Sequence, residues 1–134
     1  MKISSKGRYA VRVMAELGKN ENEFLSVSYL AEKQEITVKY LEKILSILVK
    51  HNLVESQRGS QGGYRLTKKA KDITVAEILR ATDDLPKLAP CLENPNFCPR
   101  LKNCDSIGCW EKLSLLINDY LGKISLDDLT KKKF

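Results

Sequence analysis

The sequence has little of what an enzyme needs. It contains a single histidine, His51, and no glycine-rich loop of the G-x-x-x-x-G-K-[ST] or G-x-G-x-x-G type that holds nucleotide phosphates. No histidine lies near any of the cysteines. Because nucleophilic and acid–base catalysis need such paired groups, we predict that the chain is not an enzyme.

Long apolar runs are also missing. No stretch is long enough for a transmembrane helix, and Lys and Arg interrupt the apolar residues of the first 17 positions, which argues against a secretory signal. We therefore expect a cytoplasmic protein with no membrane partner. In a reducing cytosol, clustered cysteines favour metal binding or redox sensing over structural disulfides.

Excess positive charge is confined to the first half of the chain. The 134 residues carry a net charge of +6. Residues 1–70 hold 13 Lys and Arg against 7 Asp and Glu, whereas residues 71–134 hold 10 of each. A basic region of this kind either binds a polyanion such as DNA or forms an ordinary solvated surface. The length fits one small domain followed by an appendage.

Helical periodicity predicts three helices in the basic half, over residues 5–17, 28–34 and 37–50, with Thr37 as the N-cap of the third. A short helix, a tight turn and a longer helix indicate a helix-turn-helix. The exposed face of the third helix would then enter the major groove, and basic residues at the start of the first would contact phosphates. The residues assigned to DNA on this basis are Lys39, Tyr40, Glu42, Lys43, Lys6 and Arg8.

Two strand-like runs, LVESQ and YRL, flank the glycine-rich turn RGSQGG at residues 58–63. This pattern predicts a β-hairpin, and a hairpin directly after a helix-turn-helix is a wing. Arg58 in the turn is placed to enter a minor groove, where narrow A·T tracts attract guanidinium groups. A nucleotide-binding loop is disfavoured because the turn joins strand to strand.

A capping box, Thr74 to Glu77, predicts a helix to about Thr82. A proline-punctuated loop follows, and then a helix whose apolar stripe suits pairing with a second copy or packing within the monomer. The predicted fold is mainly α with a small β-hairpin wing. We expect a winged helix-turn-helix DNA-binding domain over 1–82, a cysteine-containing cofactor loop over 83–109, and a dimerisation helix with a C-terminal tail over 110–134.

All the cysteines lie in the predicted loop, at Cys91, Cys98, Cys104 and Cys109, with the spacing C-x6-C-x5-C-x4-C. Thiolates suit both iron–sulfur clusters and zinc. Zinc sites usually offer short C-x2–4-C pairs. Only the last two cysteines, Cys104 and Cys109, come close to this spacing. The pattern therefore favours a cluster, while zinc and unrelated free thiols stay open.

Several segments together resemble the Rrf2 family of bacterial winged-helix regulators, and within it the iron–sulfur regulators of the IscR type. They are the opening MKISSKGRYAV, the segment KYLEKIL, the wing LVESQRGSQGGYRL, the T-V-A-E-I helix, and three spaced cysteines before a Trp-containing helix. The resemblance implies a homodimer with crossing C-terminal helices, a cluster in the preceding loop and a palindromic double-stranded operator. It also implies base-reading roles for Glu42 and Lys43 and a minor-groove role for Arg58.

The same resemblance implies that Cys91, Cys98 and Cys104 are cluster ligands. The sequence departs from the family at the fourth ligand. Ile107 stands where IscR-type proteins have histidine, and Arg8 stands where other relatives have an acidic residue. Cys109 is the expected substitute, with Asp105 or an exogenous thiol as alternatives. It would face away from Cys104 if the helix had already begun there, but could reach the cluster if the loop continued to Gly108.

We accordingly predict a transcriptional regulator, most simply a repressor, whose operator binding is controlled by an iron–sulfur cluster. A [2Fe–2S] cluster is favoured over [4Fe–4S], and iron–sulfur assembly or sulfur metabolism is the expected target. Two alternatives remain. One is a cluster-free regulator that senses thiol oxidation or cysteine status through a partner enzyme of cysteine synthesis. The other is a zinc-stabilised interaction domain.

Overall fold

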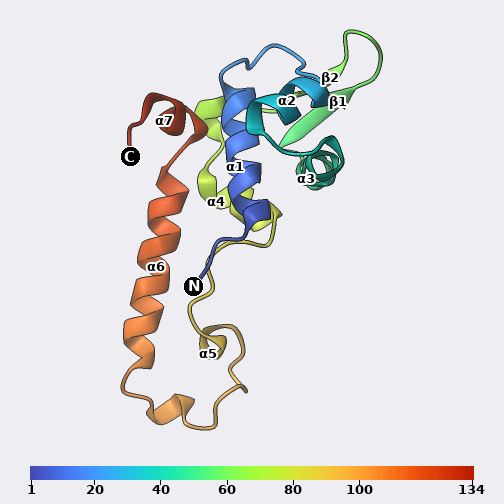
Figure 1. Cartoon of the computed structure of the whole chain (residues 1–134). Helices are drawn as coiled ribbons and strands as arrows, with labels where there is room; N and C mark the ends of the chain where they lie inside the picture. The colour runs from blue at the N-terminus through green and yellow to red at the C-terminus, as the bar shows by residue number, and fades with distance from the viewer.

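The computed structural model describes residues 1–134 and is mainly helical, with one two-stranded antiparallel sheet. It has two parts, which we call the head and the arm (Figure 1). The head contains α1 (Ser5–Gly18), α2 (Val27–Gln34), α3 (Val38–Lys50), β1 (Val54–Gln57), β2 (Gly63–Leu66), η1 (Ala70–Asp72), α4 (Val75–Ala81) and α7 (Leu126–Lys131). The arm, residues 85–123, contains α5 (Pro90–Glu93), η2 (Leu101–Asn103) and α6 (Ile107–Lys123).

Hydroxyl side chains start the helices of the head. Ser4, Ser26 and Thr37 cap α1, α2 and α3, each accepting a hydrogen bond from the backbone N–H three residues on. The turn between α2 and α3 closes at Glu35, whose left-handed backbone (φ 55°) ends α2. The predicted helix-turn-helix is therefore confirmed as local structure.

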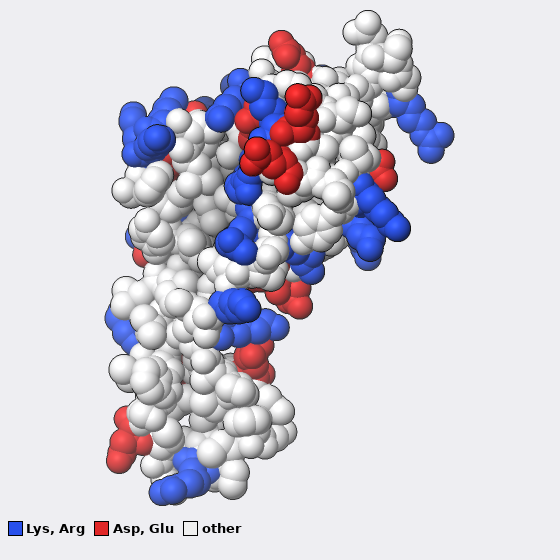
Figure 2. Space-filling view, viewed as in Figure 1, with Lys and Arg blue, Asp and Glu red and all other residues white.

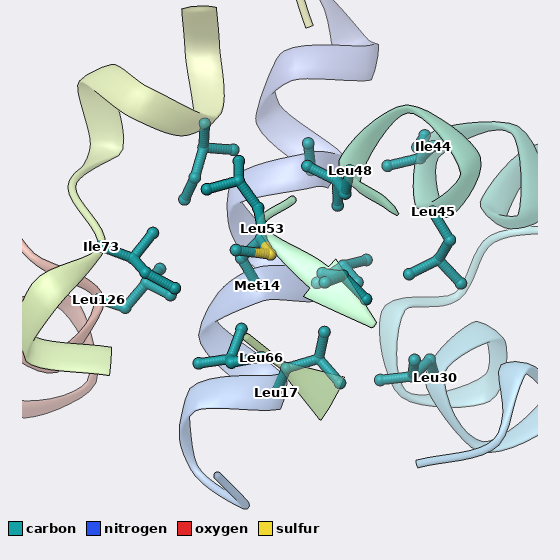
Figure 3. Packing of buried hydrophobic residues seen from close by; sticks show 14 of the residues in the cluster. Met14, Leu17, Leu30, Ile44, Leu45, Leu48, Leu53, Leu66, Ile73 and Leu126 are labelled. Carbon is teal, nitrogen blue, oxygen red and sulfur yellow. The ribbon is translucent and has the colours of Figure 1, made fainter. Parts of the chain in front are cut away.

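The core of the head forms around α1. Apolar residues recur along α1 every third or fourth position, so they share one face and meet the inner faces of α2 and α3. The hairpin and the C-terminal segment close the same cluster (Figure 3). Its labelled members are Met14, Leu17, Leu30, Ile44, Leu45, Leu48, Leu53, Leu66, Ile73 and Leu126.

The wing forms as predicted, with β1 antiparallel to β2 from the pair Val54 and Leu66 to the pair Gln57 and Gly63. Leu25, before α2, adds a one-residue third strand, because its N–H and C=O both bond to Tyr64 at 2.8 Å. Gly63 is required there. Its φ is 147°, and a Cβ would lie 2.3 Å from the Leu25 carbonyl oxygen. The predicted fold class is confirmed.

After the arm, the chain returns to the head. Val75 N–H donates to the Ile124 carbonyl, and Leu126 N–H donates to the Ile73 carbonyl, both at 2.9 Å. This bridge joins the start of α4 to the start of α7 and places Leu126 in the head core. Ser125 forms a full capping box with Asp128 at the start of α7. The last helix thus belongs to the packing of the head.

The arm extends from the head as a descending linker, a turn, and the rising helix α6 (Figure 1). The proline-rich stretch was expected to be a loop, but it contains the single turns α5 and η2. Pro90 is the first residue of α5 and explains why this turn forms, because the fixed φ of proline suits a helix start. None of the helices combines the length and apolar character that crossing a bilayer requires.

Candidate DNA-binding face and cysteine loop

The α3 helix presents two different faces. Leu41, Ile44, Leu45 and Leu48 are buried in the core, whereas Lys39, Glu42 and Lys43 are exposed. The three exposed residues follow i, i+3, i+4 spacing, so they lie together near the start of the helix. In Figure 2, basic side chains lie near this region and beside the wing, and others are spread over the rest of the visible head. The arrangement presents two ammonium donors and one carboxylate acceptor from a single helix face.

Tyr40 differs from the other α3 residues assigned to DNA. Its side chain is half-buried, and its ring meets the edge of Tyr9 with centroids 5.9 Å apart. The Arg12 guanidinium lies over the ring of Tyr9, 5.1 Å from its centroid. The ring of Tyr40 therefore packs α3 against α1, a contact between residues far apart in sequence that periodicity does not indicate.

Arg12 itself was not identified from the sequence. Its Nε donates to Gln34 Oε1 and its terminal nitrogen donates to the Gln34 carbonyl, both at 3.0 Å. Gln34 is the last residue of α2 and is buried. Arg12 thus satisfies an orphan carbonyl at the end of α2 and fixes α2 to α1.

Arg58 is exposed at the tip of the wing, next to Gly59, whose φ of 106° bends the turn. A groove of about 430 Å³ separates the wing from the start of α2, with Ser26, Gln57 and Arg58 among its lining residues. At the start of α1, Arg8 is exposed and Lys6 is partly exposed. Arg8 donates to Ser5 Oγ at 3.1 Å, within the first turn.

The cysteines all lie in the arm, and all are free thiols. Cys91 is in α5, Cys98 and Cys104 flank η2, and Cys109 is in the first turn of α6. The first three are half-buried and Cys109 is exposed. No three Cys, His, Asp or Glu side chains are close enough together to hold one metal ion. Four soft thiols in one loop suit a cluster chemically, but this conformation does not bring them together.

Cys104 is the thiol most strongly affected by its surroundings. The Ser106 hydroxyl, 3.3 Å from the sulfur, and the backbone N–H groups of Ser106 and Ile107 lower the pKa of Cys104. These N–H groups belong to the start of α6, where helices favour negative charge. The thiolate, which is the form that binds metals and reacts with oxidants, is thereby favoured.

The start of α6 bears on the fourth ligand. Ser106 is its N-cap, so Asp105 lies outside the helix and Cys109 lies inside. The two cases considered from the sequence were a helix that begins by Cys104 and a loop that continues to Gly108. The observed start of α6 at Ile107 lies between them. Glu111, which the sequence did not single out, lines a hollow of about 290 Å³ together with Cys91, Leu101 and Ile107.

Comparison with known proteins decides the family. A match to Rrf2, described as an iron-dependent transcriptional regulator, spans residues 3–132. The chain belongs to the Rrf2 family. The resemblance suggested by the sequence is therefore confirmed, and with it a role in transcription regulation instead of catalysis.

Relatives and solved structures agree with this assignment to Rrf2. The HTH-type transcriptional regulator IscR of Xenorhabdus nematophila is 37% identical over 134 residues, which is 99% of this chain and 81% of that protein. The structure of T. potens IscR has a TM-score of 0.78 at 31% identity, covering 100% of this chain and 89% of the other. CymR, the global cysteine regulator of B. subtilis, has a TM-score of 0.80 at 28% identity, covering 98% of each chain.

Proposed function

We propose that this Rrf2-family regulator binds a palindromic operator as a homodimer and that an iron–sulfur cluster in the cysteine loop controls its affinity for DNA. The observation that carries the proposal is the position of the thiols. Cys91, Cys98 and Cys104 lie in the segment of the arm that runs directly into α6, and Cys109 lies in the first turn of that helix, which exposes several large apolar side chains. A group bound by the loop would thus act at the start of the dimerisation helix.

The head supplies the DNA contacts in this proposal. Lys39 and Lys43 are donors for guanine O6 and N7, and Glu42 is an acceptor for cytosine N4. Arg58 enters the minor groove flanking the major groove occupied by α3. Lys6 and Arg8 contact phosphates, and Tyr40 reaches the backbone through its hydroxyl while its ring packs on Tyr9.

The arm supplies the dimer contacts. The side chains of Trp110, Leu116 and Tyr120 are 41%, 54% and 54% exposed, and α6 has no buried residue. The visible side of α6 in Figure 2 is mostly uncharged. An exposed apolar helix face of this kind marks an association site, and a second copy with the same face satisfies it by two-fold symmetry.

Cys91, Cys98 and Cys104 are the proposed ligands, with Cys109 as the fourth. When bound, a cluster supplies an iron centre whose oxidation and loss respond to oxygen and iron supply. We favour [2Fe–2S] over [4Fe–4S], repression of genes for iron–sulfur assembly or sulfur metabolism as the output, and proteins of those processes as partners. The thiols must draw together from their present positions, which would order residues 91–109 against the start of α6.

A second candidate function is thiol sensing without a cluster. The lowered pKa of Cys104 and the free state of all four thiols support it, as does the similarity to a cysteine regulator. In that case oxidation or a partner enzyme of cysteine synthesis would provide the signal.

The deciding experiment is an absorption spectrum with iron and sulfide analysis on protein purified without oxygen. We expect visible sulfur-to-iron charge-transfer bands and acid-labile sulfide. Cys98→Ala should abolish both while the protein stays folded and dimeric, and Phe97→Ala, beside it in the loop, should abolish neither. A Cys98→Ala protein with stoichiometric iron and sulfide would refute the ligand assignment. A colourless protein that cannot be reconstituted would favour thiol sensing, and stoichiometric zinc would make the loop structural.

A further inference from the structure

Asp84 is the last residue of the head before the arm begins, and its backbone is held in place. Asp83, with a left-handed φ of 56°, ends α4. The N–H of Asp83 donates to the Arg80 carbonyl at 3.2 Å, and the N–H of Asp84 donates to the Leu79 carbonyl at 2.7 Å. These two bonds form a Schellman motif. The end of α4 therefore fixes the backbone from which the Asp84 side chain extends.

From there the Asp84 carboxylate reaches the start of α1. Its Oδ1 accepts a hydrogen bond from the Ser4 N–H at 3.3 Å, across 80 positions of sequence. A Cβ on Gly7 would lie 2.8 Å from three Asp84 side-chain atoms, so glycine is what allows the close approach. Burial raises the pKa of Asp84, but the hydrogen bond from Ser4 and the charge of Lys6 outweigh that effect, so the pKa falls overall.

Oδ2 of Asp84 is buried and has no hydrogen-bond partner in the protein, so the Ser4 N–H is the group that holds the carboxylate. The segment it holds is the start of α1. Ser4 is the N-cap of α1, and Lys6 and Arg8 lie in the first turn that Ser4 begins. The carboxylate thus sets the position of the two side chains proposed to bind operator phosphates.

We propose that Asp84 is a positioning residue for DNA binding, which holds the start of α1 so that Lys6 and Arg8 meet the operator backbone. The inference rests on the phosphate contacts assigned to these two residues under the proposed function. Because Asp84 directly precedes the cysteine-bearing arm, the contact lies where the arm joins the DNA-binding head.

The charge of Asp84 and its positioning role predict opposite changes in DNA affinity when the residue is replaced, which makes the inference testable. A carboxylate close to a phosphate site repels DNA, so removal of its charge alone should tighten binding. If Asp84 acts by position, Asp84→Ala should weaken binding, because Ser4 loses its acceptor. Asp84→Asn keeps an Oδ1 acceptor and should restore binding to at least the wild-type level.

The measurement is the affinity for a duplex that the wild-type protein enriches from a random-sequence pool, over a range of salt concentrations. Each lost phosphate contact makes the slope of log K against log salt shallower by about 0.9 and weakens binding about tenfold near 0.1 M salt. We expect Asp84→Ala to lose about one contact per subunit. In a Lys6→Ala, Arg8→Ala background it should have no further effect. The matched control is Asp72→Ala, which removes an exposed carboxylate of the head.

A second variant covers the case in which Asp84→Ala does not fold. Gly7→Ala should displace Asp84 without removing any of its atoms, and alanine suits a helix better than glycine does. It should reproduce the weaker binding and the shallower slope. Wild-type affinity and slope in Asp84→Ala or Gly7→Ala would overturn the inference, as would an equal loss in the Lys6→Ala, Arg8→Ala background. If Lys6→Ala, Arg8→Ala itself binds like wild type, the phosphate contacts of the proposed function fail first.

Discussion

The head and the arm use apolar residues in opposite ways. The head buries a continuous cluster to which α1, α2, α3, the hairpin, η1, α4 and α7 all contribute. No residue of α5, η2 or α6 is buried, although α6 carries several large apolar side chains, among them Trp110, Leu116 and Tyr120. The head is therefore complete within one chain, whereas the arm needs something else to cover it.

Both ends of the arm are fixed to α4. Asp84, at the entry to the arm, belongs to the motif that ends α4, and Ile124, at the exit, bonds to Val75 at its start. A movement at either end of the arm would thus displace one end of α4, a short helix that packs against α1. In the proposed mechanism, this connection carries a change in the cysteine loop to the DNA-binding face.

The largest contrast between head and arm should appear in large-to-small substitutions. Leu45→Ala, in the head core, should lower the free energy of unfolding by about 3–5 kcal/mol, because it leaves a cavity. Leu116→Ala, in α6, should change the unfolding of the dilute monomer by less than about 0.5 kcal/mol. Urea unfolding at low protein concentration measures both. Equal losses would show that the arm has a core of its own.

The return of the chain to the head predicts that a residue beyond the arm behaves like the head. Leu126→Ala should cost about 2–4 kcal/mol, since its side chain is fully buried beside Ile73. Phe134→Ala, at the exposed end of the same segment, is the control and should cost almost nothing. If Leu126→Ala is as mild as the control, the last helix does not stay packed on the head in solution.

Self-association should depend on the arm alone. Leu116→Asp places a charge in the exposed stripe of α6 and should weaken dimerisation by about 1–3 kcal/mol, or roughly 5- to 150-fold. Sedimentation equilibrium gives the dissociation constant, and circular dichroism checks that the head is unchanged. Phe134→Asp makes the same change at an exposed residue outside the stripe. A Leu116→Asp protein that dimerises like wild type would exclude this face as the interface.

The sequence predicts the local structure well and the long-range contacts poorly. Capping residues such as Thr37 and Thr74 act on neighbours three positions away, and Gly59 bends the turn in which it lies, so each leaves a readable pattern. The Asp84–Ser4 contact, the bridge from Leu25 to Tyr64 and the bond from Leu126 to Ile73 join positions 39 to 80 residues apart, and no short motif encodes them. The cysteine spacing likewise identifies four candidate ligands without giving their arrangement.

The smallest predicted effect lies in the capping box at the start of α4, close to where the chain returns from the arm to the head. Glu77 accepts hydrogen bonds from the Thr74 N–H at 2.9 Å and from Lys68 at 3.1 Å. Burial raises the pKa of Glu77, but the bonds from Thr74 and Lys68 outweigh it and lower the pKa below its usual range. The ionised form is therefore stabilised by folding. This stabilisation is fully present above the ordinary pKa, about 4.3, and is lost as the pH falls through the lowered value in the folded protein.

Glu77→Gln removes the charge and keeps an acceptor oxygen, so it should cost only about 0.5–1 kcal/mol at pH 7. Wild type and variant should converge as the pH falls through the lowered pKa of Glu77 in the folded protein, because wild-type Glu77 then becomes neutral as well. Urea unfolding across this pH range measures the difference. Glu32→Gln, on the exposed side of α2, should match wild type throughout. A Glu77→Gln penalty that persists undiminished in acid would come from packing instead of charge, and the start of α4 would then be as insensitive to protonation as the buried core of the head.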